Sequence, residues 1–302
     1  MLPKRILITG ASGFVGMNLT SHLNNNGYDA TSVSLRSNDW QQYLQSPSDA
    51  LIHLAGKAHD TANTSSAEEY FAINRDLTID LFKNFLNSDI RDFVFFSSVK
   101  AVADSVAGIL HENVEAKPLT PYGQSKLEAE EFLRSQSLPH NKRLFIIRPC
   151  MVHGPGNKGN LNLLYKIVKR GIPWPLASFE NQRSFLNIDN LCFLLTSLIE
   201  KEAVPSGTYN FSDDDTLSTN QLISLISENL GRNSKLLKIS PKVIEILAKI
   251  GDTFSLPLNS ERLKKLTESY VVSNAKIKKV LEIERLPVGV IEGMIKTIRS
   301  FK

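Results

Sequence analysis

The stretch that constrains the fold most lies near the N-terminus, where an apolar run leads directly into spaced glycines. Arg5 to Thr9 reads R-I-L-I-T, which is typical of a strand buried on both faces. G-A-S-G-F-V-G follows from Gly10 to Gly16, and the next residues show helical periodicity up to Gly27. The order strand, glycine loop, helix is the context in which such glycines indicate a dinucleotide-binding turn of an α/β fold.

The glycines of this loop serve different purposes in such a turn. Gly10 can form the tight turn, Gly13 lets the backbone approach a pyrophosphate, and Gly16 lets the helix pack on the strand. The N-terminus of the helix adds free N–H groups and a positive dipole end. An ordinary strand-to-helix turn is the alternative. The expected cofactor-binding residues here are Gly10, Ser12, Gly13, Phe14, Val15 and Gly16.

The end of the second predicted strand, Ala30 to Leu35, indicates which dinucleotide is bound. In this fold an acidic residue at that point holds the adenosine ribose 2′-hydroxyl, whereas an Arg accepts a 2′-phosphate. The sequence has Arg36, and the nearest Asp is Asp39. NADP(H) is therefore favoured over NAD(H), and a surface Arg without a partner is the competing interpretation.

Further apolar runs alternate with helical stretches. Strands are predicted at 49–56, 91–98 and 144–148, and helices at 68–87 and 125–135. This alternation predicts a Rossmann-type, doubly wound parallel sheet. His53, inside the first of these strands, is expected to be a core histidine. The strand ends that should border the cofactor contain Leu54, Ala55, Gly56 and Pro149, and Lys57 could face the same site.

The stretch T-P-Y-G-Q-S-K places Tyr122 and Lys126 four residues apart, which is one turn of a helix that begins near Pro121. A fixed ammonium favours the phenolate and should lower the pKa of Tyr122 from its reference value near 10. Such a Tyr can exchange a proton with a hydroxyl or carbonyl. Ser97 and Ser98 end a strand at the edge that faces the ligand. The alternative is that Tyr122 and Lys126 are only solvent-exposed neighbours on one helix face, without a catalytic role.

Composition and cysteine content limit the classes of protein to which this chain can belong. Of 302 residues, 42% are hydrophobic and 22% charged, as in soluble globular proteins. No apolar run approaches the roughly 20 residues that span a bilayer, and the N-terminus lacks a signal-peptide pattern. We therefore expect a cytoplasmic protein without a membrane partner. Cys150 and Cys192 lie in apolar contexts, which predicts buried thiols rather than a disulfide or a metal site.

The net charge of +4 is unevenly distributed. Residues 231–302 carry 15 Lys and Arg against 7 Asp and Glu, a net +8, so the remainder carries −4. This basic part could attract an anionic small molecule or form only a solvated surface. No nucleic-acid motif is present, so nucleic acid is not an expected partner.

Beyond Pro149 the sequence becomes turn-rich, and helices then predominate. We expect an NAD(P)-binding domain over residues 1–158 and a smaller C-terminal α/β lobe over residues 159–302 that holds the substrate. Residues 186–201 are expected to pack back on the first domain.

Several motifs are shared with one known family. They are T-G-A-S-G-F-V-G at 9–16, H-L-A-G at 53–56, F-F-S-S at 95–98, P-Y-G-Q-S-K at 121–126, I-R-P at 147–149 and H-G-P-G at 153–156. Together they resemble the extended short-chain dehydrogenase/reductase family of nucleotide-sugar epimerases, dehydratases and reductases. S-S-V-K at 97–100, K-G-N-L at 158–161 and N-Q-R-S-F at 181–185 are similar to a bacterial UDP-glucose 4-epimerase-like subgroup. That subgroup includes 4-keto reductases for UDP-acetamido-dideoxy sugars of surface polysaccharides.

The resemblance implies a role for each matching residue. Tyr122 would be the catalytic acid/base, Lys126 would bind the nicotinamide ribose and lower the pKa of Tyr122, and Ser98 would hydrogen-bond the sugar C4 oxygen. Asn74 matches a residue near the cofactor. Asn160 and Leu161 match a turn that holds the uracil, and Arg183 matches an Arg that grips the diphosphate, although it could instead pair with Glu180 or Asp189. With Lys57, the expected substrate-binding residues are therefore Lys57, Ser98, Asn160, Leu161 and Arg183.

Departures from the family pattern narrow the activity. Dehydratases carry an Asp-Glu pair where this chain has Val99-Lys100, which disfavours a 4,6-dehydratase. We expect reduction of a 4-keto UDP-sugar, because Arg36 favours NADPH. Epimerisation at C4 of a UDP-hexose is the alternative, and a non-catalytic NADP(H)-binding regulator is a remote one. The family also implies a homodimer formed through the helices near 78–87 and 125–135.

Overall fold

The computed structural model describes residues 3–57, 66–157, 159–254 and 259–301. Its strands are β1 Arg5–Thr9, β2 Asp29–Val33, β3 Ala50–His53, β4 Asp92–Phe96, β5 Ile109–Leu110, β6 Arg143–Pro149, β7 Met151–His153, β8 Arg183–Asn187, β9 Gly207–Phe211, β10 Thr216–Leu217 and β11 Val271–Val272. Its helices are α1 Phe14–Asn25, α2 Gln41–Leu44, α3 Ala67–Phe71, α4 Leu77–Leu86, α5 Pro121–Ser135, α6 Asn160–Lys169, α7 Ile188–Glu200, α8 Thr219–Asn229, α9 Pro241–Phe254, α10 Ser260–Thr267, α11 Ala275–Leu281 and α12 Val290–Arg299, with a π-turn η1 at Ala72–Asp76 and a 3₁₀ turn η2 at Val99–Ala101.

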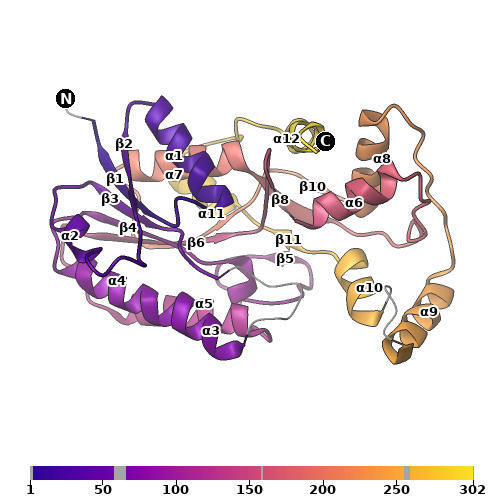
Figure 1. Ribbon diagram of the computed structural model, residues 1–302, viewed down its shortest axis with the longest axis horizontal. Helices are drawn as coiled ribbons and strands as arrows, with labels where there is room; N and C mark the ends of the chain where they lie inside the picture. The colour runs from indigo at the N-terminus through magenta and orange to yellow at the C-terminus, as the bar shows by residue number, and fades with distance from the viewer. Residues whose placement is uncertain (1–2, 58–65, 158, 255–258, 302) are drawn as a thin grey trace.

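A six-stranded parallel sheet forms the centre of the first lobe. The strand order is β2-β1-β3-β4-β6-β9. Helices α1, α7 and α11 cover one face of the sheet, and α4 and α5 cover the other (Figure 1). The predicted Rossmann-type α/β fold is therefore confirmed.

Alternation of side chains along the strands produces these two faces. In β1, Ile6 and Ile8 join the core beneath α1 and α7, whereas Leu7 joins the core beneath α4 and α5. All three are fully buried. Successive side chains of a strand point to opposite faces, so a strand covered on both sides needs an unbroken apolar run.

The strand order reverses between β1 and β3. From β1 the chain adds β2 on one side, and the remaining strands continue on the other side. In open parallel sheets this reversal opens a crevice at the carboxyl ends of the strands. The glycine loop after β1 and residues 54–57 after β3 both lie at this edge.

A second lobe surrounds a separate core built from α6, α8, α12, β8 and the α9–α10 pair. Its sheet has the order β10-β8-β7. Two later segments belong to the first lobe, because β9 forms the edge of the six-stranded sheet and α7 packs against α1. The division at residue 158 remains a prediction. Cys150 and Cys192 are buried free thiols, as expected. Among the described residues, no helix combines the length and apolar character needed to cross a membrane.

A matched pair of glycines tests the tight turn after β1. Gly10 and Gly27 both have positive φ, 73° and 81°, but a Cβ on Gly10 would lie 2.6 Å from the Ala55 amide nitrogen, whereas one on Gly27 would meet nothing within 4 Å. Left-handed backbone costs a non-glycine residue about 1–2 kcal/mol. Gly27→Ala should lower the free energy of unfolding by about that much. Gly10→Ala should lower it by roughly 1–3 kcal/mol more, because the backbone must shift. Equal losses in urea denaturation would contradict the close approach.

Candidate functional site

The glycine loop leaves the N-terminus of α1 open. A Cβ on Gly16 would lie 2.3 Å from the Gly10 carbonyl oxygen, so both positions require close backbone contact. Gly13 is the N-cap of α1, no side chain caps the helix, and its first turn has no acidic residue. An uncapped helix N-terminus offers N–H groups and a positive dipole end to an anion. The loop therefore fits the diphosphate of a dinucleotide.

Asn74 holds the segment that follows β3. Its Oδ1 accepts a hydrogen bond from the Lys57 amide at 2.7 Å, and its Nδ2 donates to the Lys57 carbonyl at 3.1 Å and to Ser125 Oγ at 3.2 Å. A Cβ on Gly56 would come within 2.9 Å of Asn74 Oδ1 and 3.2 Å of Lys126 Nζ. Gly56, Asn74 and Lys126 are thus brought together. The predicted helix at 68–87 contains the π-turn η1 at this point, a feature often found at functional sites.

Tyr122, Lys126 and Ser98 meet at the edge of the sheet beside this segment. Thr120 caps α5, and Tyr122 and Lys126 lie one turn apart near its N-terminus. Ser98, which follows β4, hydrogen-bonds the Tyr122 hydroxyl. Lys126 is buried, donates to the Phe96 carbonyl at 2.7 Å and lies 4.8 Å from the ring centroid of Phe95. The phenol of Tyr122 and the ammonium of Lys126 are therefore close because of their spacing on α5. The fold brings the Ser98 hydroxyl to them from the end of β4.

The electrostatics of Tyr122 differ from the expectation. Burial raises the pKa of Tyr122, and the hydrogen bond with Ser98 opposes that rise only in part. Burial also lowers the pKa of Lys126 to about 8, against the stabilising charge of Glu130. The prediction that Lys126 depresses the pKa of Tyr122 is wrong for the protein alone. The sequence spacing gives the distance between the two groups but not the cost of burying them.

His53 is a core residue, as predicted. Its ring nitrogens contact Thr9 Oγ1 at 2.7 Å and Thr78 Oγ1 at 2.9 Å. Burial and the nearby Lys126 charge lower the pKa of His53 to about 3, so the ring is neutral.

Tyr70 and Lys57 line the outer side of this group. The ring of Tyr70 packs edge-on against Tyr122 with centroids 6.2 Å apart, and Lys57 Nζ lies 5.8 Å from the Tyr70 centroid. Lys57 forms an ion pair with Glu69 at 2.5 Å. Its expected substrate contact stays a prediction. Nothing in the sequence around Tyr70 signals its contact with Tyr122.

Two cations lie next to this group on the side of the second lobe. Lys100, two residues after Ser98, donates to the Asp104 carbonyl at 2.8 Å and lies 4.4 Å from the ring centroid of Tyr270. Arg183, the first residue of β8, donates to the Lys265 carbonyl. Burial lowers the pKa of both, and the Arg183 charge lowers that of Lys100 further.

Within the described part of the chain, no carboxylate lies close enough to neutralise either cation. Among the described residues, neither Lys100 nor Arg183 forms an ion pair with a carboxylate, and Asp189 pairs instead with Lys296 at 2.6 Å. Such half-buried cations are suited to bind an anion. Lys100 was not predicted as a site residue, although the S-S-V-K motif contains it.

Other predicted site residues lie apart from this group or are only partly described. Arg36 is exposed after β2, and it contacts no acceptor in the described part of the chain. Leu161 is buried in the second core, and Pro149 is buried at the end of β6. Asn160 begins α6, but its side chain lies outside the described residues.

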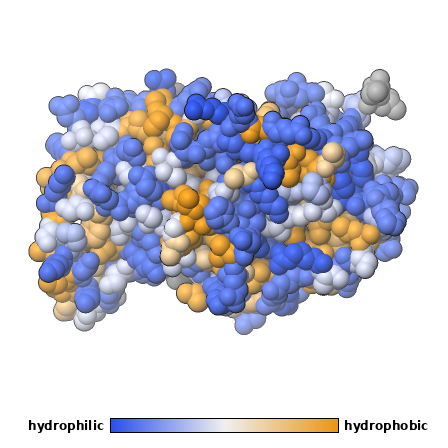
Figure 2. All heavy atoms as spheres, turned by 180° about the vertical axis from the view of Figure 1, so that it is seen from behind, coloured by the Kyte–Doolittle hydropathy of each residue, from blue (hydrophilic) through white to orange (hydrophobic). Residues whose placement is uncertain are grey.

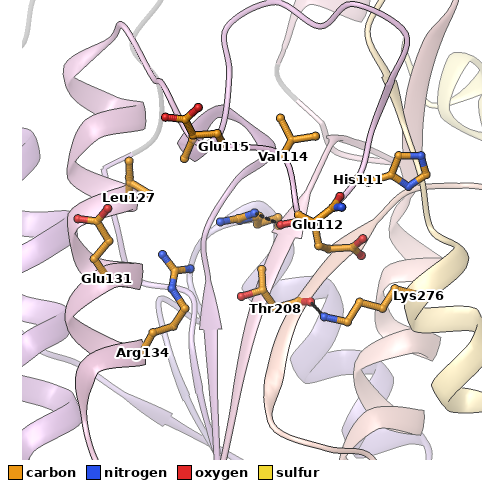
Figure 3. A pocket seen from close by; sticks show the side chains of 12 residues that line it. His111, Glu112, Val114, Glu115, Leu127, Glu131, Arg134, Thr208 and Lys276 are labelled. Atoms are coloured by element: carbon orange, nitrogen blue, oxygen red, sulfur yellow. Dashed lines mark hydrogen bonds between the residues drawn. The ribbon is translucent and has the colours of Figure 1, made fainter.

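A cavity of about 960 Å³ lies between α5 and residues 111–116, and neither Ser98 nor Tyr122 lines it (Figure 3). Its lining includes Arg134, Arg148 and Lys276, and none of the predicted cofactor or substrate residues. Arg148 and Arg134 both pair with the buried carboxylate of Glu130. Arg148 therefore ties α5 to β6, whereas Arg134 pairs with Glu130 within α5 and Lys276 donates to the Thr208 carbonyl at 2.8 Å.

A family model described as the NAD dependent epimerase/dehydratase family matches residues 6–211. The chain belongs to this family. It is an enzyme of the extended short-chain dehydrogenase/reductase type.

Individual relatives agree with this family. The chain is 29% identical over 245 residues to a UDP-glucose 4-epimerase of Vibrio cholerae, covering 74% of each protein. It is 26% identical over 291 residues to the N-acetyl-alpha-D-glucosaminyl-diphospho-ditrans,octacis-undecaprenol 4-epimerase of Escherichia coli O157:H7, covering 91% of this chain and 84% of the relative. The solved structure of MoeE5 in complex with UDP-glucose and NAD has the same fold, with a TM-score of 0.76, 20% identity and 98% of each chain covered.

Proposed function

We propose that this enzyme reduces the 4-keto group of a UDP-acetamido-dideoxy sugar with NADPH, in the synthesis of a surface polysaccharide. The observation that carries the proposal is the Ser98–Tyr122 hydrogen bond, one helical turn from the buried Lys126 and at the same edge of the sheet as the open N-terminus of α1. A bound reduced nicotinamide would supply the hydride. A nicotinamide dinucleotide fits the strand–glycine–helix turn, because the N-terminus of α1 has no side-chain cap and no acidic residue in its first turn.

The protonated state of the Tyr122 hydroxyl suits a reduction. Reduction of a carbonyl adds hydride to C4 and a proton to the C4 oxygen, so a proton donor is needed. Burial keeps the Tyr122 hydroxyl protonated at neutral pH. In the proposed mechanism, Ser98 orients the C4 oxygen, Tyr122 donates the proton, and the charge of Lys126 stabilises the phenolate that remains.

Epimerisation at C4 is the second candidate. The two relatives described above are named as 4-epimerases. The same residues would serve, with Tyr122 first accepting a proton and later returning it. The E. coli relative is named for a sugar on undecaprenol diphosphate, so a lipid-linked diphosphosugar is a further substrate class for the same chemistry.

A direct assay separates reduction from epimerisation. The proposal expects stoichiometric NADPH consumption with 4-keto UDP-sugars, whereas epimerisation of UDP-sugars would proceed without net consumption. Tyr122→Phe should keep the fold and lower turnover by roughly 10²–10⁴, because proton transfer is lost. Tyr43→Phe, on the exposed α2, is the matched control. A Tyr122→Phe variant with wild-type turnover would remove Tyr122 from the mechanism.

Arg36 is proposed to select NADPH through its 2′-phosphate. Because the exposed Arg36 forms no hydrogen bond or ion pair with another described residue, it is available to an anion at the end of β2. A charge-assisted contact contributes about 1.5–3 kcal/mol. Arg36→Ala should therefore weaken NADPH binding by about tenfold or more and leave NADH binding nearly unchanged. Equal affinities of the wild-type protein for the two cofactors, measured by fluorescence titration, would refute this selection and favour the epimerase.

Arg183 is proposed to hold the diphosphate of the substrate together with Lys100. Its contact is remote from C4, so it should contribute mainly uniform binding and change KM more than kcat. Arg183→Ala should weaken UDP binding by roughly tenfold and leave NADPH binding unchanged. Arg170→Ala, exposed in the second lobe, is the matched control. Unchanged UDP affinity in calorimetry would leave the proposed site without its anchor.

A homodimer is proposed through the outer faces of α4 and α5. Most of their apolar residues face their own sheet, among them Leu81, Phe85 and Leu133. Phe132 and Leu86 remain partly exposed on the outside. Sedimentation should show a dimer at micromolar concentration and a monomer for Phe132→Glu, and a monomeric wild-type protein would contradict the proposal.

A further inference from the structure

Helix α9 exposes an apolar face to solvent. Its exposed apolar side chains recur every three or four residues and so lie along one side of the helix. Ile246 is 59% exposed and Phe254 is 71% exposed. On the side of α9 that packs against the protein, Ile244 and Ala248 are buried in the core of the second lobe. We call the exposed face the α9 stripe; it consists of Val243, Ile246, Leu247, Ile250 and Phe254.

The stripe lies at the end of the molecule that is farthest from the six-stranded sheet (Figure 1). Seen from behind, this end shows apolar surface at its lower edge, among hydrophilic residues (Figure 2). Soluble monomers rarely expose contiguous apolar surface of this kind unless it binds something.

Basic side chains lie beside one edge of the stripe. At about 100° per residue, Lys242 and Lys249 both fall beside this edge, whereas Glu245 and Asp252 fall on the far side of α9. Asp252 is further engaged by Ser260, whose hydroxyl donates to it at 2.6 Å. Between residues 232 and 265 there are 8 Lys and Arg and 3 Asp and Glu. The apolar stripe therefore sits in a locally cationic surface.

We propose that the α9 stripe docks this protein on a bilayer surface that contains anionic phospholipid. An amphipathic helix with apolar residues on one side and Lys beside them lies in the interface, with its apolar side among the acyl chains. The 14 residues of α9 are too few to span the roughly 30 Å hydrocarbon core, so the helix would lie flat. Charge complementarity favours anionic lipid over a second copy of this basic surface, which would repel it.

The position of α10 connects the stripe to the candidate site. α10 packs on α9, and its Lys265 carbonyl accepts the hydrogen bond from Arg183. Docking through α9 would therefore hold the Arg183–Lys100 end of the site close to the membrane surface. A diphosphosugar carried by a lipid could then be bound without leaving the bilayer. This last step rests on the lipid-linked substrate class named with the second candidate function, whereas the docking itself does not.

Vesicle flotation tests the docking without any substrate. Full-length protein should float with vesicles of phosphatidylcholine and phosphatidylglycerol at least roughly tenfold better than with phosphatidylcholine alone, because each Lys near an anionic surface strengthens binding about fivefold. Raising the ionic strength should reduce this preference. Absence of flotation with either vesicle would overturn the proposal.

Surface variants identify the contact. Ile246→Glu combined with Ile250→Glu should abolish flotation, and Lys242→Glu combined with Lys249→Glu should remove the preference for anionic vesicles. Ile291→Glu, at an Ile that is 43% exposed on α12, is the matched control and should float like the wild-type protein. Circular dichroism and NADPH binding should be unchanged in all variants, which excludes unfolding.

Two outcomes would overturn the assignment to lipid. The first is flotation of the Ile246→Glu/Ile250→Glu variant at the wild-type level. The second is a change in the sedimentation mass of the same variant without vesicles, because the stripe would then be an interface between protein chains. Loss of flotation together with normal turnover on a water-soluble UDP-sugar would uphold docking independently of the catalytic proposal.

Discussion

The buried carboxylate of Glu130 determines where the candidate catalytic groups lie. Glu130 is fully buried on α5, where Arg148 of β6, Arg134 and the Ser97 hydroxyl all contact it. The Arg148 and Ser97 contacts fix α5, with Tyr122 and Lys126, to β6 and to the end of β4 that precedes Ser98, whereas Arg134 pairs with Glu130 within α5. Removing one partner of such a buried pair usually costs several kcal/mol, because the remaining charge has no water around it. The geometry of the site thus depends on a charge that takes no part in the proposed chemistry.

Two places in the molecule can bind a negatively charged group, and they use different chemical groups to do so. At the N-terminus of α1 the groups are backbone N–H donors, and Gly10 and Gly16 matter because the backbone segments there pack too closely for a Cβ. At the start of β8 and in η2 the groups are side chains, Arg183 and Lys100, half-buried and without carboxylate partners among the described residues. The Ser98–Tyr122 pair lies between segments from both places. This arrangement suits a substrate and a cofactor that each carry phosphates and meet at one carbon atom.

Much of this arrangement follows from local sequence pattern, and the failures have identifiable physical causes. The strand–glycine–helix start and the alternation of apolar runs predicted the parallel sheet, because each is determined by neighbouring residues. The spacing of Tyr122 and Lys126 predicted their common helix face. The direction of the Tyr122 pKa shift was wrong because it depends on burial, to which distant segments contribute. Lys100 and Tyr270 are 170 positions apart in the sequence and meet only in the folded chain, so no local sequence pattern could predict their contact.

The path of the chain between the lobes has a consequence for folding. After building β6 the chain leaves for the second lobe, then returns as α7 to cover α1 and as β9 to pair with β6. Until residue 211 has been made, β6 is an open edge, and the face that α7 covers is bare. Unpaired edges and bare apolar faces favour association between chains. The six-stranded sheet is therefore complete only once residue 211 has been synthesised, and until then its β6 edge is open to association with other chains.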